Sequence, residues 1–340
     1  MTQVRYIYLI KDIVMKNFCK HIAMMVIAIV LSPFHAYAIV EHGDVNNDRV
    51  ISINDVTSLI DHLLMDYISA VDDINGDAMV NIDDVTALID YLLKGDGEWQ
   101  WAYTGPAFPD SALVFDVNGV QFAMIPVEGG SFRRLSIVPE VTLGDYYMAQ
   151  TEVTKALWEA VMETAAPQPV YYCGSPWEPV SLTTWWECQE FITRHNELTG
   201  QDFHLPTFDQ WIYAASGGKQ THGYTYAGSN EIDEVAWYYG NLPAIFSGPL
   251  PVGMKAPNEL GLYDMCGNAR EWVYNDVSEY GDELIPLDDP MHDITHKYMI
   301  GGNFDCNADN CRIMSWYPTT SSALNMCGLR LALGPDLSND

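Results

Sequence analysis

Two stretches of the chain carry apolar residues at the spacing of an amphipathic helix, and they are copies of one another. The second copy begins 29 residues after the first, at Asp73 against Asp44. The apolar positions are Val56, Leu59, Ile60, Leu63 and Leu64, then Val85, Leu88, Ile89, Leu92 and Leu93. Because such positions share one helix face, the pattern predicts two short helices that bury these faces against each other.

Polar residues in front of each predicted helix follow the spacing of an EF-hand calcium loop. Oxygen-bearing side chains stand at loop positions one, three, five and twelve, and a backbone carbonyl is available at position seven. The predicted ligands are Asp44, Asn46, Asp48, Val50 and Asp55 in the first loop, and Asp73, Asn75, Asp77, Met79 and Asp84 in the second. Arg49 and Ala78 replace the glycine usual at position six. We therefore expect a calcium-binding module over residues 43–95.

The pattern changes after residues 96–112, a Pro-containing stretch that indicates a linker. Short alternating strands separated by glycines are predicted at 117–126, 129–132 and 141–148. Three helices are also predicted from their capping residues: Thr154 to Met162, Thr184 (with Glu187) to Leu198, and a helix opened by Thr207 with Gln210 and stopped by Gly217. Residues 113–334 are therefore expected to form a second domain that mixes helices and strands.

Charge and the amino-terminal segment limit the partners and the compartment. The formal net charge of −30 would repel nucleic acid and anionic membranes, so neither is expected as a partner. Residues 1–38 have a basic start, an apolar run and a small-x-small site ending at Ala38, which predicts an export signal. Met15 is a more usual start, so residues 1–14 are interpreted as an upstream extension. No cysteine follows Ala38 directly, so we expect a secreted or periplasmic product without a membrane anchor.

Residues 251–272 combine backbone freedom with oxygen ligands. Glycines at 253, 261 and 267 permit backbone geometries that a side chain would block, and Asp264, Asn268 and Glu271 offer oxygens to a hard cation. A buried glycine turn between strands explains the same residues without a cation. On spacing alone, both interpretations stay open.

The stretch PVGMKAPNELGLYDMCGNAREW resembles the PN-x-x-GLYDM-x-GN-x-x-EW signature of the formylglycine-generating enzyme family, also called the sulfatase-modifying-factor family. Further pieces that resemble this family lie at 122–132, 146–162, 179–192, 205–218, 301–312 and 328–333. The resemblance implies an α+β, C-type-lectin-like domain with sparse regular structure, beside the small all-α module. It also implies a calcium ion held by the side chains of Asp264 and Glu271 and the carbonyls of Gly267 and Ala269. Arg270 stands where the family usually has Trp.

The repeat at 43–95 resembles the dockerin module, whose family docks onto cohesin domains of scaffold proteins. That resemblance implies a cohesin-like partner. Positions ten and eleven of the loops are Ile53-Asn54 and Ile82-Asp83 rather than the small hydroxyl pair often found there, which leaves the partner's identity open.

Cys306 and Cys311 match the two cysteines that bind copper in catalytic members of the formylglycine-generating enzyme family and oxidise a client sulfatase cysteine with oxygen. A structural disulfide is the alternative, because export would leave six of the seven cysteines in an oxidising compartment. Two functions therefore compete. One is a copper-dependent formylglycine-generating oxidase; the other is a non-catalytic lectin-fold module that binds protein or glycan, tethered to a scaffold in extracellular polysaccharide breakdown.

Overall fold

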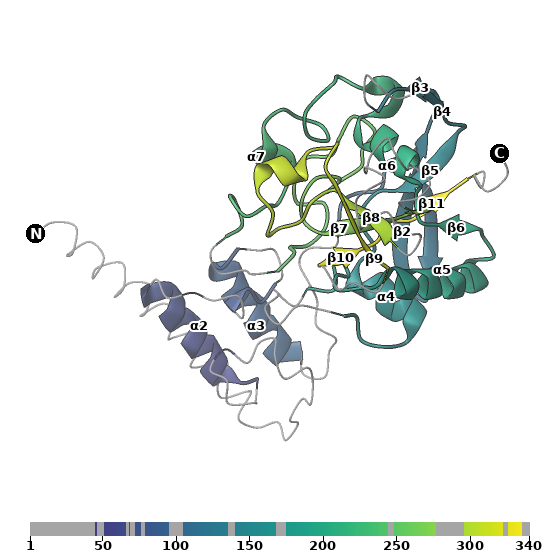
Figure 1. Cartoon of the computed structure of the whole chain (residues 1–340). Helices are drawn as coiled ribbons and strands as arrows, with labels where there is room; N and C mark the ends of the chain where they lie inside the picture. The colour runs from purple at the N-terminus through teal and green to yellow at the C-terminus, as the bar shows by residue number, and fades with distance from the viewer. Residues whose placement is uncertain are drawn as a thin grey trace, which may run out of the picture. The chain divides into compact units, whose positions relative to one another are not determined.

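The computed structural model describes residues 45, 51–65, 68, 72–75, 79–94, 105–134, 140–167, 175–243, 248–276, 296–321 and 326–334. The chain divides into two compact units, residues 1–102 and 103–340 (Figure 1). Among the described helices, none has the length and apolar character needed to cross a membrane. The predicted export segment, Cys173 and the predicted ligands Asp44, Asn46, Asp48, Val50 and Asp77 lie outside the described residues.

The first unit contains the two helices that the repeat predicts, α2 (Ile53–Met65) and α3 (Ile82–Lys94). Their shared core pairs equivalent positions of the two copies: Val45 with Ile74, Val56 with Val85, and Leu59 with Leu88. The predicted apolar helix faces are too wide, because Leu64 is 54% exposed and Leu93 is 43% exposed. The last turn of each helix therefore presents apolar side chains at its surface.

The twelfth loop residues, Asp55 and Asp84, are both fully buried at the helix starts. Asp55 Oδ2 accepts a hydrogen bond from the Ser52 amide at 2.7 Å. Asp84 Oδ2 accepts from the Asn81 amide at 2.7 Å, and its Oδ1 accepts from the amides of Ile74 and Asn75 at 2.8 and 3.1 Å. Each carboxylate thus holds backbone amides at the start of its helix, and Asp84 also orders the second loop.

The second unit is built on a five-stranded sheet in the order β1-β2-β5-β11-β6, with antiparallel neighbours throughout. Its strands are β1 (Leu113–Val117), β2 (Val120–Val127), β5 (Tyr146–Ala149), β6 (Phe203–His204) and β11 (Ala332–Leu333). A two-stranded ribbon pairs β3 (Ser131–Phe132) with β4 (Val141–Thr142). The carboxy-terminal β11 lies inside this sheet between β5 and β6, so the first and last strands of the unit belong to one sheet.

The predicted strand at 117–126 is two strands. Asn118 and Gly119 have φ values of 52° and 88°, which places both central turn residues in the left-handed region of a two-residue hairpin. The predicted single strand at 141–148 is likewise divided into β4 and β5. The predicted segments therefore coincide with β2, β3, β4 and β5, whereas β1 was missed except for its last residue.

The three predicted helices are present, with the predicted caps. Helices α4 (Lys155–Met162), α5 (Trp185–Thr199) and α6 (Phe208–Ala215) are each opened by a threonine, and α5 and α6 have complete capping boxes. Helices α4 and α5 pack together beside the five-stranded sheet (Figure 1). Short helices complete the unit: η2 (Gly218–Gln220), α7 (Ile232–Val235) and η3 (Ala308–Cys311).

A second sheet, in the order β10-β7-β8-β9, positions the central turn and the cysteine segment. Its strands are β7 (Arg270–Asp276), β8 (His296–Ile300), β9 (Trp316–Thr320) and β10 (Cys327–Gly328), and only the β10–β7 pair is parallel. The turn at 251–272 leads into β7, and the cysteine segment follows β8. Because β7 and β8 are neighbours, these two parts of the chain lie side by side.

Candidate functional site

Glu271 and Arg330 form a fully buried ion pair at the centre of the second unit. Arg330 Nη2 and Nε donate to Glu271 Oε1 at 2.8 and 3.0 Å, and Trp211 Nε1 donates to Oε2 at 2.6 Å. Arg330 also donates to the carbonyls of Ala149 and Tyr263 at 3.0 and 2.8 Å. The pair therefore joins β7, helix α6, the five-stranded sheet and the central turn through one carboxylate and one guanidinium.

Two further buried carboxylates, Glu152 and Asp264, surround this pair. Glu152 accepts from the Ala269 amide at 2.9 Å and from the Asn268 side chain at 3.2 Å, while Asp264 Oδ2 accepts from the Gly253 amide at 2.6 Å. Burial raises the pKa of Asp264 to about 6, and burial with the nearby Asp264 and Glu271 charges raises the pKa of Glu152 well above its usual range. Three carboxylates thus face a single guanidinium.

The calcium ligand set implied by the family resemblance fits this geometry only in part. Asp264 Oδ1 is buried without a hydrogen-bond partner, so one oxygen remains for a cation. Both oxygens of Glu271, in contrast, are already held by Arg330 and Trp211. Gly267 takes a positive φ of 83° and approaches the Trp237 carbonyl so closely that a Cβ would lie 2.2 Å from its oxygen. In the described part of the chain, no group of three His, Cys, Asp or Glu side chains is arranged to hold a metal ion.

The structure places Cys306 and Cys311 at the two ends of a short segment that folds back through helix η3. Both thiols are buried: Cys306 is 5% exposed, and Cys311 is fully buried in the core. Burial raises the pKa of the Cys311 thiol, and neighbouring Cys266 and Cys306 raise it further. Neither Cys306 nor Cys311 is in a disulfide.

Arg270 contacts the first thiol of the pair directly. Its Nη2 lies 2.9 Å from Cys306 Sγ, and its guanidinium lies over the Tyr317 ring at 4.8 Å. The guanidinium therefore contacts the Cys306 sulfur and the Tyr317 ring at the same time. The residue that departs from the family's usual Trp therefore lies at the thiol pair.

Sequence reasoning missed three members of this site. Glu152 and Arg330 were part of the matching segments, but their contacts with the central turn join residues more than 50 positions apart. Cys266 was counted only as one of six cysteines, yet it lies in the central turn beside Cys311. Its presence within the glycine-rich turn was the only signal.

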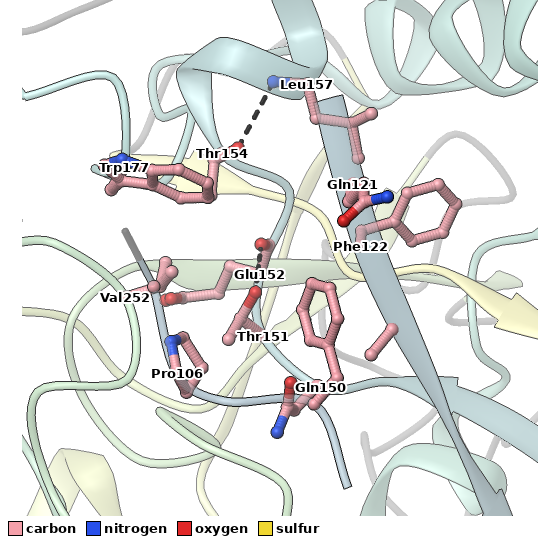
Figure 2. A pocket seen from close by; sticks show the side chains of 13 residues that line it. Pro106, Gln121, Phe122, Gln150, Thr151, Glu152, Thr154, Leu157, Trp177 and Val252 are labelled. Carbon is pink, nitrogen blue, oxygen red and sulfur yellow. Dashed lines mark hydrogen bonds between the residues drawn. The ribbon is translucent and has the colours of Figure 1, made fainter. Parts of the chain in front are cut away.

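Glu152 also lines a small cavity. Its volume is about 30 Å³, room for roughly two water molecules and too little for a sugar ring. Figure 2 shows Gln150, Thr151 and Glu152 along one wall, with Trp177 and Phe122 on others.

Comparison with known proteins identifies relatives of the second unit. "Chaperone protein LppX" of Paenibacillus barcinonensis is 33% identical over 201 residues, covering 44% of this chain and 70% of that protein. The formylglycine-generating enzyme of Bos taurus is 26% identical over 149 residues, covering 40% of this chain and 37% of the enzyme. The match to the enzyme therefore spans little more than a third of its length.

Solved structures share the fold at low sequence identity. PvdO from Pseudomonas aeruginosa matches with a TM-score of 0.53 at 18% identity, covering 66% of this chain and 99% of that one. Treponema denticola variable protein 1 matches with a TM-score of 0.51 at 22% identity, covering 67% and 100%. The profile described as a sulfatase-modifying factor enzyme 1-like domain matches residues 116–334. The chain therefore belongs to the family of sulfatase-modifying factor enzyme 1-like domains.

Proposed function

We propose that residues 116–334 form a copper-dependent oxidase domain that acts on a cysteine of a client protein. The observation that carries this proposal is the thiol pair, Cys306 and Cys311, which lie close together as free thiols with the Arg270 guanidinium on one of them. The similarity to the formylglycine-generating enzyme of Bos taurus supports the same chemistry.

The donor set fits Cu(I), because soft thiolates bind this ion at low coordination number. Bound copper would supply the site at which oxygen is reduced while the client cysteine is oxidised to formylglycine. In this chain, Cys306 and Cys311 would hold the ion, and Arg270 would balance negative charge at Cys306. Since the pair is buried, the client cysteine would reach it only when the segment around helix η3 moves outward.

The experiment is a titration of the reduced full chain with Cu(I), followed by oxygen consumption with a CxPxR-type peptide. We expect one Cu(I) per chain and loss of both uptake and turnover in Cys311→Ser. Cys188→Ser is the matched control, because Cys188 is an equally buried free thiol in another part of the core. No Cu(I) uptake by the folded, reduced protein would exclude the oxidase.

A second candidate is a non-catalytic module that binds a client protein or glycan. The burial of both thiols favours it, since a catalytic sulfur must meet its substrate. The relative named "Chaperone protein LppX" points the same way. If the folded, reduced protein takes up no Cu(I), this candidate replaces the oxidase.

We propose that the first unit is a dockerin-like module that binds calcium and tethers the domain to a cohesin-like protein outside the cell. Three predicted ligands have buried carboxylates, which supports a cation site: Asp55 and Asp84 at loop position twelve, and Asp73 at position one of the second loop. Calorimetry of the full chain with calcium tests it: uptake of about two ions is expected, and none would remove the proposal.

A further inference from the structure

A third thiol, Cys266, lies in the same buried core cluster as the candidate pair. It is fully buried in the central turn, and the Ala227 amide donates to its Sγ at 3.3 Å. Two residues before Ala227, the Thr225 carbonyl accepts from the Ile313 amide at 3.3 Å, and Ile313 directly follows the Cys311 segment. The same short stretch, 225–227, therefore touches both cysteine-bearing segments.

A second connection runs on the opposite side of these sulfurs. The Gly267 amide donates to the Gly301 carbonyl at 2.8 Å, one residue after Cys266. The next residue, Gly302, lies so close to Cys311 that a Cβ there would be 2.8 Å from Cys311 Sγ. Cys266 and Cys311 are thus enclosed between the same two stretches of backbone, and the Cys311 pKa responds to both Cys266 and Cys306.

We propose that Cys311 is the central sulfur of a three-thiol relay, forming a disulfide with either Cys306 or Cys266. The relay uses the same thiol pair as the proposed oxidase but needs no copper, so the two ideas can fail separately. When Cys311 is bonded to Cys266, the disulfide holds two oxidising equivalents and Cys306, the thiol beside Arg270, is free.

The relay involves an oxidation followed by an exchange. In the first step, Cys306 and Cys311 lose two protons and two electrons to a disulfide oxidant, which is reduced to two thiols, and the Cys306–Cys311 bond forms. In the second step, the Cys266 thiolate attacks Cys311 Sγ, the Cys306–Cys311 bond breaks, and the proton released by Cys266 passes to solvent or to Cys306. The leaving sulfur, Cys306, departs beside the Arg270 guanidinium, 2.9 Å away. No electrons are gained or lost in the exchange.

The chain's trypsin sites separate the two bonds. Cleavage after Lys255, Arg270, Lys297 and Arg312 leaves Cys266 in one peptide, and Cys306 with Cys311 in another. A Cys306–Cys311 bond therefore lowers the mass of a single peptide by two hydrogens, whereas a bond to Cys266 joins two peptides. Oxidation with oxidised glutathione should run for hours at about pH 8.5, because the attacking species in thiol–disulfide exchange is a thiolate.

In the wild-type full chain we expect both products, the closed single peptide and the joined pair. Cys306→Ser should give only the joined pair, Cys266→Ala only the closed peptide, and Cys311→Ser neither. Circular dichroism and tryptophan fluorescence identify variants that keep the fold, and Cys306→Ala replaces any serine variant that does not.

A folded Cys306 variant that leaves Cys266 and Cys311 as free thiols would overturn the relay, as would a Cys266–Cys306 bond in Cys311→Ser. Cu(I) uptake distinguishes this failure from that of the oxidase, because Cys266→Ala retains both proposed copper ligands. Unchanged uptake in Cys266→Ala alongside loss of the joined pair is the expected result.

Discussion

His195 should make the second unit acid-sensitive, because it is a fully buried histidine among aromatic rings. It lies in α5, with ring centroids at 4.6 Å from Phe203, 5.3 Å from Phe122 and 5.7 Å from Phe191. These rings give no compensation for a positive charge removed from water. Burial lowers the pKa of His195 from 6.5 to about 4, with the Asn196 side chain acting weakly in the opposite direction.

The lowered pKa of His195 determines how the free energy of unfolding changes with pH. The unfolded chain takes up the proton near pH 6.5 and the folded chain only near pH 4, so stability from neutral His195 falls as the pH drops through this window. The full difference corresponds to about 3 kcal/mol, and about 2 kcal/mol is lost by pH 5. Asp264 acts in the opposite direction, because its folded pKa of about 6 lies above its unfolded value and its protonation favours the folded state.

Because Asp264 opposes the effect of His195, the test compares the pH dependence of wild type with that of a His195 variant. We would measure urea unfolding of wild type and His195→Phe at pH 8 and pH 5 by tryptophan fluorescence, to which the second unit contributes all tryptophans except Trp99 and Trp101. The wild type should lose about 2 kcal/mol more than His195→Phe between these pH values. His222→Gln, whose side chain is 63% exposed, is the surface control and should behave as wild type. Equal losses in wild type and His195→Phe would refute the reasoning.

Two further predictions concern the candidate site, and a third concerns the first unit. Glu271→Gln should lower the free energy of unfolding by about 3 kcal/mol even without calcium, because it removes the one carboxylate charge that contacts the buried Arg330 directly; denaturant unfolding in a calcium chelator measures this. Gly302→Ala should cost more than Gly119→Ala, because both positions have positive φ but only the Gly302 Cβ meets backbone and a sulfur; roughly 1 kcal/mol of strain is common to both, and equal melting temperatures would contradict the argument. Millimolar calcium should raise the helicity of the first unit, and unchanged circular dichroism would exclude coupled folding there.

Local signals predicted the helices well because their determinants lie within a few residues. Thr184 and Glu187 satisfy each other's amides at the start of α5, whatever surrounds them. The hairpin between β1 and β2 was locally encoded too, in Asn118-Gly119, but the alternating pattern on both sides was interpreted as continuous. Turn chemistry was thus the missed local signal.

The candidate site depended on contacts that no local pattern contains. Glu271 was assigned to calcium through a resemblance, yet its oxygens are claimed by Arg330, 59 positions later, and by Trp211, 60 positions earlier. Cys306 and Cys311 were recognised from the sequence, but not that Gly302 allows the chain to pack tightly against Cys311. Spacing identified the residue types that lie together; only the tertiary structure shows which of them neutralise one another.

The central turn and the cysteine segment are hydrogen-bonded to each other. The Gly267 amide donates to Gly301 and the Phe304 amide donates to Asn268, so the turn is hydrogen-bonded to the chain just before Cys306. Asn268 in turn binds Glu152, one of the three carboxylates that share the single Arg330 charge. The buried carboxylates and the cysteine segment are therefore joined through the Asn268 side chain and two backbone hydrogen bonds.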